Sequence, residues 1–210
     1  MPPAICLVFL KAPQLGQVKT RLAATTGALV ATEIFRATAS ASVRAIPSSW
    51  EVVISYTPPQ AEQTMRQWLD PLRPALSYRP QHEGDLGNRL NRAFEEANPS
   101  TRQPVFAIGG DCPDLSPKIF EQALETLQES DCVLGPALDG GYYLIGTRAH
   151  HPILFSGIPW STEEVLAKTC ANATRSGLKT ILLEPLPDID TEEDLKNLPP
   201  GHYLHQLYQP

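Results

Sequence analysis

Short, continuous apolar runs alternate along the chain with longer segments in which apolar residues recur at helical spacing. The first run, residues 4–10, has the pattern of a strand that is buried on both faces of a parallel sheet. Similar runs predict further strands at residues 51–56, 75–79, 105–108, 132–135, 142–146 and 179–183. The helical segments between them are predicted at residues 28–46, 61–69 and 85–97, from Ser116 onward, from Trp160 to about Ser176, and from Thr191 onward.

This alternation of strands and helices indicates an α/β fold with a mostly parallel central sheet that helices cover on both faces. The expected architecture is a Rossmann-type three-layer sandwich. At 210 residues the chain suits a single domain over residues 1–210, because no repeat, low-complexity segment or linker interrupts it. Ligands bind outside the carboxyl ends of the strands in such sheets, so we expect a site in the loops that follow the strands.

The charge balance narrows the choice of partners. The sequence has 17 Lys and Arg against 23 Asp and Glu, which gives a net charge of −6. An acidic chain lacks the basic footprint that general nucleic-acid binding requires. No apolar stretch approaches the roughly 20 residues that span a bilayer, and the first apolar run has neither a preceding positive charge nor a small-residue cleavage site. We therefore expect a cytoplasmic protein that binds neither nucleic acid nor membrane.

The cysteines and histidines suggest neither a disulfide framework nor a zinc site. The cysteines lie far apart and form no Cys-x-x-Cys pair; they are Cys6, Cys112, Cys132 and Cys170. In a chain large enough to build its own core, such cysteines are expected to be reduced thiols. His150 and His151 are adjacent in sequence, so in a helix they would not lie on one face and could not bind one zinc ion together.

The loop after the first strand carries three cations within eleven residues. They are Lys11, Lys19 and Arg21, and Gly16 between them lets the backbone turn tightly. Thr20 can donate a hydrogen bond from its hydroxyl group. Such loops bind phosphate through backbone N–H groups and cationic side chains, although the spacing matches neither the P-loop nor the dinucleotide fingerprint. In an acidic protein, this concentration of positive charge favours a phosphate site over a solvated basic loop.

A second polar cluster, residues 109–114 (GGDCPD), follows directly after a predicted strand. The glycines let a ligand approach the backbone, and a carboxylate at the end of a strand can hold Mg²⁺ or Mn²⁺. Asp114 is explained as the cap of the following turn. Asp111 is therefore the candidate metal ligand.

Two further clusters carry acidic residues near strand ends. Asp139 and the two glycines after it precede a predicted strand, where they form either a hairpin turn or part of a binding site. Asp188 and Asp190 lie two residues apart, so that in an extended segment they share one face. Thr191 can cap the helix that follows. A helix cap alone would explain Asp190 or Thr191, but not the adjacent pair of acids.

Together the four clusters resemble the GT-A-fold nucleotide-diphospho-sugar transferases and, more narrowly, the DUF2064 family. The stretches that carry the resemblance span nearly the whole chain in the family's order: FLKAPQLGQVKTRL, EGDLGNRLNRAF, AIGGDCPDLS, VLGPALDGGYYLIG, IPWSTEEVL and LPDIDTEEDL. The first and last of them also look similar to motifs of the guanylyltransferases of molybdopterin and phospholactate metabolism, which share the fold. Six ordered blocks are far more specific than any one of them.

The resemblance implies a role for the first, second and fourth clusters. The three cations of the first loop, with Gly16 and Thr20, would hold the phosphates of a nucleotide. The metal, Mg²⁺ or Mn²⁺, would be held by Asp111, Asp188 and Asp190. Asp111 would thus be catalytic through its metal.

The third cluster is implied to serve the sugar or the acceptor. Asp139 would orient or deprotonate the acceptor hydroxyl group as a catalytic residue. The substrate would lie against the neighbouring residues, which are Gly140, Gly141, Tyr142 and Trp160. The block at residues 85–89 matches as well, but the sequence suggests no role for it.

The expected reaction is glycosyl transfer from a nucleotide-diphospho-sugar to a small-molecule acceptor, and two alternatives stay open. In nucleotidyl transfer, a phosphorylated small molecule would attack the α-phosphate of an NTP and release pyrophosphate. The three cations in the first loop suit a triphosphate somewhat better than a diphosphate, which favours nucleotidyl transfer. The DGGYY and PWST stretches resemble the glycosyltransferase group instead, which favours glycosyl transfer. The other alternative is a non-catalytic nucleotide-binding module. The sequence identifies neither the base, the sugar, the acceptor nor the oligomeric state.

Overall fold

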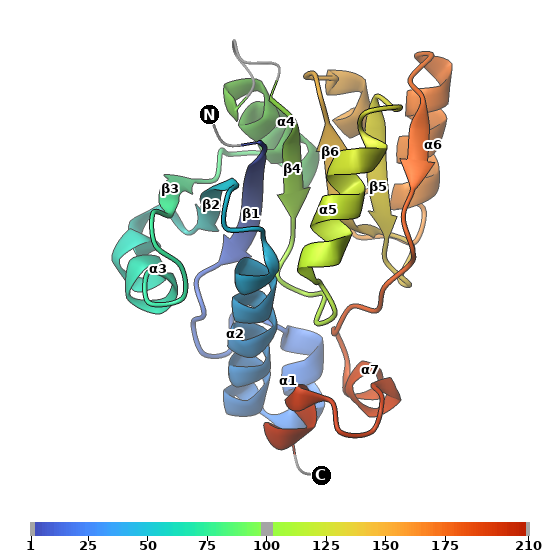
Figure 1. Cartoon of the computed structure of the whole chain (residues 1–210). Coiled ribbons are helices and arrows are strands. Elements are labelled where there is room, and N and C mark those ends of the chain that lie inside the picture. The colour runs from blue at the N-terminus through green and yellow to red at the C-terminus, as the bar shows by residue number, and fades with distance from the viewer. Residues whose placement is uncertain (1–2, 98–102, 209–210) are drawn as a thin grey trace.

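A seven-stranded sheet forms the centre of the protein in the computed structural model, which describes residues 3–97 and 103–208 (Figure 1). Its strands are β1 (Ile5–Lys11), β2 (Glu51–Thr57), β3 (Ser77–Pro80), β4 (Val105–Ile108), β5 (Cys132–Pro136), β6 (Tyr142–Thr147) and β7 (Thr180–Leu182). They lie in the order β3-β2-β1-β4-β6-β5-β7, and of these strands only β6 runs antiparallel to its neighbours. The predicted mostly parallel α/β sheet is confirmed.

Helices cover both faces of this sheet. They are α1 (Thr20–Thr26), α2 (Ala28–Ala45), α3 (Glu62–Leu69), α4 (Leu86–Ala97), α5 (Pro117–Thr126), α6 (Val165–Arg175) and α7 (Glu192–Asn197), with 3₁₀ turns at Pro59–Ala61, Pro152–Phe155 and Tyr203–Gln206. Helices α2, α3 and α5 pack on one face, and α4 and α6 pack on the other, which gives three layers. No helix in the described ranges has the length and apolar character needed to cross a membrane.

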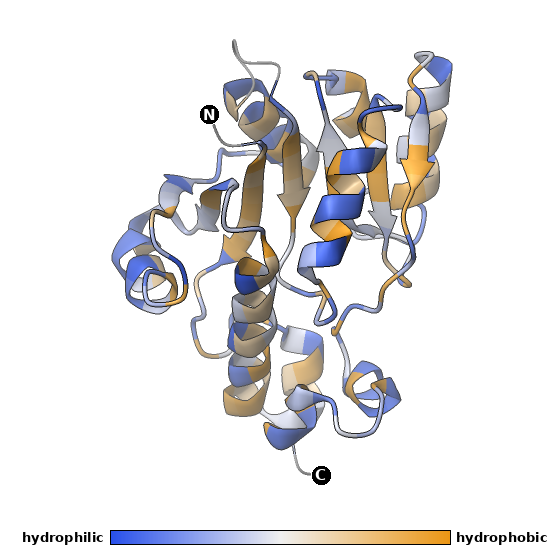
Figure 2. Ribbon diagram, in the orientation of Figure 1, coloured by the Kyte–Doolittle hydropathy of each residue, from blue (hydrophilic) through white to orange (hydrophobic). Residues whose placement is uncertain are grey.

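The sequence of β1 explains how one strand serves both layers. Its side chains alternate between the two faces of the sheet. Cys6, Val8 and Leu10 belong to the core under α2, α3 and α5, whereas Ile5 and Leu7 belong to the core under α4 and α6. Figure 2 accordingly shows β1 and β4 as mostly hydrophobic, as expected for strands that are buried on both faces.

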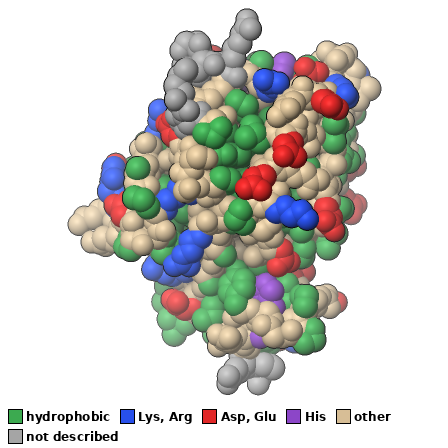
Figure 3. Space-filling view, viewed as in Figure 1, with side chains coloured by type: hydrophobic (Ala, Val, Ile, Leu, Met, Phe, Trp, Pro, Cys, Tyr) green, Lys and Arg blue, Asp and Glu red, His purple; other side chains and the backbone are tan. Residues whose placement is uncertain are grey.

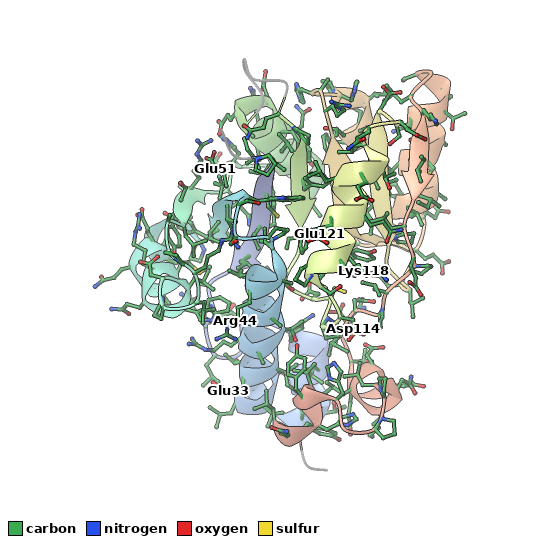
Figure 4. The ribbon with its side chains drawn as sticks, viewed as in Figure 1. Glu33, Arg44, Glu51, Asp114, Lys118 and Glu121 are labelled. Atoms are coloured by element: carbon green, nitrogen blue, oxygen red, sulfur yellow. The ribbon has the colours of Figure 1, made fainter. Side chains whose placement is uncertain are left out.

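The outward faces of α2 and α5 carry charged side chains. Glu33 and Arg44 of α2, and Lys118 and Glu121 of α5, carry side chains that lie on the outer side of the sheet (Figure 4). Figure 3 shows that charges of both signs are mixed on this side of the molecule. Such a mixture is typical of a solvated surface.

A third, smaller core lies beyond the carboxyl ends of the strands, where Figure 1 shows α1 and α7. It includes Leu22 of α1, Leu195 of α7 and Ile189 in the segment before α7, all of them 0% exposed. Helices α1 and α7 are in direct contact. Packing in this core holds the segment after β1 against the segment that carries Asp188 and Asp190.

Two predicted segments differ from the structure. The segment between β1 and α2, expected to be a loop, contains α1; at 7 residues this helix is too short to show a helical period, and Leu22 packs it onto the third core. The helix expected from Trp160 begins instead at Val165. Ser161 has a φ of 66°, which a right-handed helix excludes, and the Thr162 hydroxyl group donates to a carbonyl within the same turn.

Candidate functional site

A cavity of about 1000 Å³ lies at the carboxyl edge of the sheet. It lies where the strand order reverses, since β2 pairs with one side of β1 and β4 with the other. Ligands bind at such switch points in open α/β sheets. The predicted site residues that line the cavity are Lys11, Lys19, Thr20, Arg21, Asp111, Asp139, Gly141, Tyr142, Trp160, Asp188 and Asp190. Gly16 and Gly140 lie outside its lining.

Lys19 joins two of the acidic segments within this cavity, and its side chain is only 3% exposed. Its Nζ pairs with Asp111 Oδ1 and, at 3.0 Å, with Asp190 Oδ1. Burial lowers the pKa of Lys19, but the two carboxylates outweigh burial and raise it above its ordinary value. An ammonium group has three donors, so one N–H remains for a further ligand.

The backbone fixes the two acidic segments to each other. The N–H of Ile189, between Asp188 and Asp190, donates to the carbonyl of Asp111 at 3.0 Å. Directly afterwards, α7 begins with a reciprocal capping box made by Thr191, the residue predicted as its cap. The carboxylates of the two segments are therefore held on one side of the cavity.

Asp188 shows that negative charge is concentrated here. Burial first, and then the charges of Asp139 and Asp190, raise the pKa of Asp188 to about 6. Arg21 offsets little of this charge, since its Nη1 lies 4.0 Å from Asp190 Oδ2 and its side chain is 76% exposed. The site therefore has an excess of carboxylate over cationic groups.

The oxygen donors of this site fit a hard divalent cation such as Mg²⁺ or Mn²⁺. The side chains of Asp111 and Asp190 are 51% and 45% exposed. Within the described ranges, no group of three acidic, cysteine or histidine side chains is close enough to hold a metal ion by itself. Mg²⁺ commonly binds to one or two carboxylates and to the phosphates of its substrate. The arrangement suits such a shared site better than a cage made only by protein.

The hairpin between β5 and β6 is both a turn and a wall of the cavity. Asp139 Oδ1 accepts a hydrogen bond from the N–H of Gly141 at 2.8 Å, so that the second carboxylate oxygen is left for a ligand. Gly140 has a φ of 88°, and its carbonyl accepts a hydrogen bond from the N–H of Leu166 at 2.9 Å. Gly140 therefore supports the site from outside the lining.

We expect Gly140→Ala to lower the free energy of unfolding by more than about 3 kcal/mol. A Cβ at this position would lie 2.3 Å from the carbonyl oxygen of Glu163, in addition to the strain of the positive φ. Gly201→Ala is the matched control, because Gly201 has a φ of 84° and open space around a Cβ. It should cost only about 1 kcal/mol. Urea unfolding measures both variants, and equal losses would contradict the close contact with Glu163.

Trp160 lines the cavity and lies against the start of α4. Its place depends on Gly87, where a Cβ would lie 2.6 Å from Trp160 Nε1 and 2.6 Å from the carbonyl oxygen of Phe155. Asp85 accepts a hydrogen bond from the N–H of Asn88 at 2.8 Å, as the cap of the same helix. The block that contains Asp85 and Gly87, for which the sequence suggested no role, therefore positions the wall that carries Trp160.

Sequence reasoning missed Thr57 and Gln81 and left Arg89 without a role, although all three line the cavity. The Gln81 amide donates to the carbonyl of Ser55 at 2.8 Å. Arg89 donates to the carbonyl of Gly84 at 2.9 Å and to Gln81 Oε1 at 3.3 Å. Thr57 ends β2 and Gln81 follows β3, so their position at the carboxyl edge was the one signal that could have identified them.

We expect Gly87→Ala to displace the Trp160 indole, at a stability cost of about 1–3 kcal/mol. Trp50 and Trp68 are buried, so acrylamide quenching of tryptophan fluorescence should report mainly on Trp160. Quenching should increase in Gly87→Ala. Asn88→Ala changes an exposed side chain on the same turn and should leave quenching unchanged. Identical quenching in the two variants would show that Gly87 does not position the indole.

Comparisons with known proteins give one family and a set of related structures. A family model described as "Uncharacterized protein conserved in bacteria (DUF2064)" matches residues 41–162. The crystal structure of a proposed nucleotide-diphospho-sugar transferase from Desulfovibrio desulfuricans G20 is 30% identical in sequence, with a TM-score of 0.88 over 99% of this chain and 94% of that chain. Among curated proteins, no sequence matches significantly.

Two more distant structures share the fold. The first is CMP:2-keto-3-deoxy-manno-octonic acid synthetase in complex with CTP, at 12% identity and a TM-score of 0.56 over 92% of this chain and 95% of that chain. The second is Rv0371c of Mycobacterium tuberculosis H37Rv in complex with manganese, at 16% identity and a TM-score of 0.52 over 93% of this chain and 97% of that chain. Similarity at these identities concerns the fold alone.

Proposed function

The chain belongs to the DUF2064 family, and from that membership and its cavity we propose that it is a transferase with a nucleotide-diphospho-sugar as donor. The sugar passes to a hydroxyl group of a small-molecule acceptor, with Mg²⁺ or Mn²⁺ as cofactor. The observation that carries this proposal is that the cationic loop after β1 and the carboxylates of Asp111 and Asp190 meet in one cavity. Phosphate and a divalent cation are the ligands that such a combination attracts.

The loop after β1 would bind the diphosphate. Lys11 and Arg21 are exposed and line the cavity, and Lys19 retains one N–H donor after its two ion pairs. Charge-assisted hydrogen bonds from these groups to phosphate oxygens are about twice as strong as neutral ones. Thr20 adds a hydroxyl donor, and Gly16 turns the loop with a φ of 74°.

Asp111 and Asp190, with Asp188 beside them, would hold the divalent cation next to the diphosphate. Such a cation, when bound, would supply Lewis-acid charge that stabilises the nucleoside diphosphate as its bond to the sugar breaks. One carboxylate oxygen of Asp139 accepts the hydrogen bond from the N–H of Gly141 in the hairpin, and the other oxygen would face the acceptor. In this role it orients the acceptor hydroxyl group and accepts its proton as the new bond to the sugar forms.

A second candidate is nucleotidyl transfer, in which a phosphorylated small molecule attacks the α-phosphate of an NTP and pyrophosphate leaves. The fold shared with a CTP-bound synthetase favours it, as do the three cations of the first loop. The resemblance of the DGGYY and PWST stretches to the glycosyltransferase group weighs against it. We therefore retain it as the alternative.

The products distinguish the candidates. In the presence of Mn²⁺, the protein is incubated with UDP-, GDP-, ADP- and dTDP-sugars and a mixture of polyol acceptors. The proposal predicts release of a nucleoside diphosphate, which EDTA abolishes. Pyrophosphate release from an NTP and a sugar phosphate would establish nucleotidyl transfer instead. Nucleotide binding with neither product would indicate a non-catalytic binding module.

A further inference from the structure

Lys19 lies between two of the carboxylates that the proposed function assigns to the divalent cation. Its Nζ pairs with Asp111 Oδ1 and, at 3.0 Å, with Asp190 Oδ1. One oxygen of each carboxylate is therefore already engaged by a positive charge. Under the proposed function, the same ammonium group also faces the diphosphate of the nucleotide. One lysine thus belongs to the surroundings of both ligands.

The backbone directs Lys19 into this position at a cost in strain. Lys19 has a φ of 47° and a ψ of 49°, a left-handed conformation that is uncommon for residues other than glycine, asparagine and aspartate. Its carbonyl accepts a hydrogen bond from the N–H of Ala23 at 2.8 Å, and Leu22 fastens the same helix to the third core. Strain of this kind persists only where the surrounding structure enforces it, and it is concentrated at ligand sites. The pairing of Lys19 with the two carboxylates is a contact that such strain can serve.

A divalent cation has to compete with this ammonium group. The side chain of Lys19 is 3% exposed, so it stays beside the carboxylates unless another anion in the cavity draws it away. Mg²⁺ takes oxygen ligands at about 2.0–2.1 Å, so a cation on the paired oxygen of Asp190 would stand within about 5 Å of Lys19 Nζ. Two positive charges at such a separation repel each other in a partly buried site. Within residues 3–97 and 103–208, no group of three acidic, cysteine or histidine side chains gives the cation a separate site.

We infer that Lys19 competes directly with the divalent cation for Asp111 and Asp190, so that the protein binds the cation weakly until a nucleotide is present. The third N–H of Lys19 makes the first contact with a phosphate oxygen. Hydrogen bonds to the charged phosphates then draw the ammonium group from the carboxylates, which leaves Asp111 and Asp190 to the cation. Cation and nucleotide therefore bind cooperatively. The inference rests on the proposed function and adds a coupling between its two ligands.

Titration with Mn²⁺ alone tests the competition without any nucleotide. Electron paramagnetic resonance of free Mn²⁺ gives the Kd for the wild-type protein, for Lys19→Met and for Lys19→Gly. We expect the Kd to be at least about tenfold lower in both variants than in the wild type, because no ammonium group has to be displaced. Lys19→Gly is included because glycine suits the left-handed backbone, which offsets part of the stability that Lys19→Met loses.

Arg21→Met is the matched control. It also removes a positive charge near Asp190, but from an exposed side chain whose Nη1 is 4.0 Å from Asp190 Oδ2. The Kd for Mn²⁺ should change by less than about threefold in this variant. An unchanged Kd in both Lys19 variants would overturn the inference. An equal gain in Arg21→Met would also overturn it, since that result would indicate a general effect of charge.

Thermal unfolding of the wild-type protein tests the cooperativity. The melting temperature is measured with Mn²⁺, with UDP, GDP, ADP or dTDP, and with Mn²⁺ and each nucleotide together. The rise with both ligands should exceed the sum of the two separate rises, and a rise no greater than that sum would overturn the inference. A protein that no nucleotide stabilises, even with Mn²⁺, would contradict the proposed function itself. The titration with Mn²⁺ alone would still decide the competition, so the two failures are distinguishable.

Discussion

Asp111→Asn should lower turnover at least about 100-fold, because the amide removes the charge that holds the divalent cation beside the diphosphate. Its backbone would remain in place, since the hydrogen bond that fixes it comes from Ile189 to the Asp111 carbonyl. The side chain is half exposed, so the effect on stability should be within about 1 kcal/mol. Initial rates at saturating donor and Mn²⁺ measure the loss.

Asp114→Asn is the control for this variant. Asp114 lies three residues further along the same loop, and its carboxylate is 3.4 Å from His202 Nε2 instead of facing the cavity. It should retain wild-type turnover. Equal losses in the two variants would show that the loop as a whole is sensitive, and would remove the special role of Asp111.

Lys19→Met should weaken nucleotide binding at least about tenfold and lower the free energy of unfolding by about 1–3 kcal/mol. Methionine fills a similar volume, but it leaves the carboxylates of Asp111 and Asp190 without their shared cation. The expected cost lies between that of a surface ion pair and that of a buried one, because the lysine is buried while both carboxylates are about half exposed. Calorimetry and urea unfolding give the two values.

Lys11→Met separates the two effects. Lys11 also lines the cavity but is exposed, so its replacement should weaken nucleotide binding while the free energy of unfolding changes by no more than about 0.5 kcal/mol. A loss of stability equal to that of Lys19→Met would contradict the central position that the structure gives to Lys19. Unchanged nucleotide binding in both variants would contradict the role of the loop.

Much of the site could be predicted because parallel strands share one geometry. Their carboxyl ends meet at one edge of the sheet, so polar residues at or just after the ends of β1, β4 and β5 converge there whatever their distance in sequence. Lys11, Asp111 and Asp139 were recognisable on this ground alone. The continuous apolar runs predicted the strands for a related reason, since a strand buried on both faces tolerates few polar residues.

The pairing within the site could not be predicted in the same way. Lys19 and Asp190 are separated by 171 positions, and nothing in either motif indicates that one neutralises the other. The contact between Gly87 and Trp160 depends on how α4 packs on the turn before α6, which no local pattern encodes. Helix α1 was missed because its stability comes from packing against α2 and α7, more than from its own sequence.

The central claim is that the cavity binds a nucleotide through its diphosphate and a divalent cation, and thermal unfolding tests it most directly. The melting temperature is measured with UDP-, GDP-, ADP- and dTDP-sugars and with NTPs, in Mn²⁺, Mg²⁺ or EDTA. A ligand at about 100 times its Kd adds roughly 2.7 kcal/mol, which raises the melting temperature by roughly 5–10 °C for a chain of this size. We predict such a rise with one nucleotide sugar, and its loss in EDTA. No rise with any nucleotide would contradict the account.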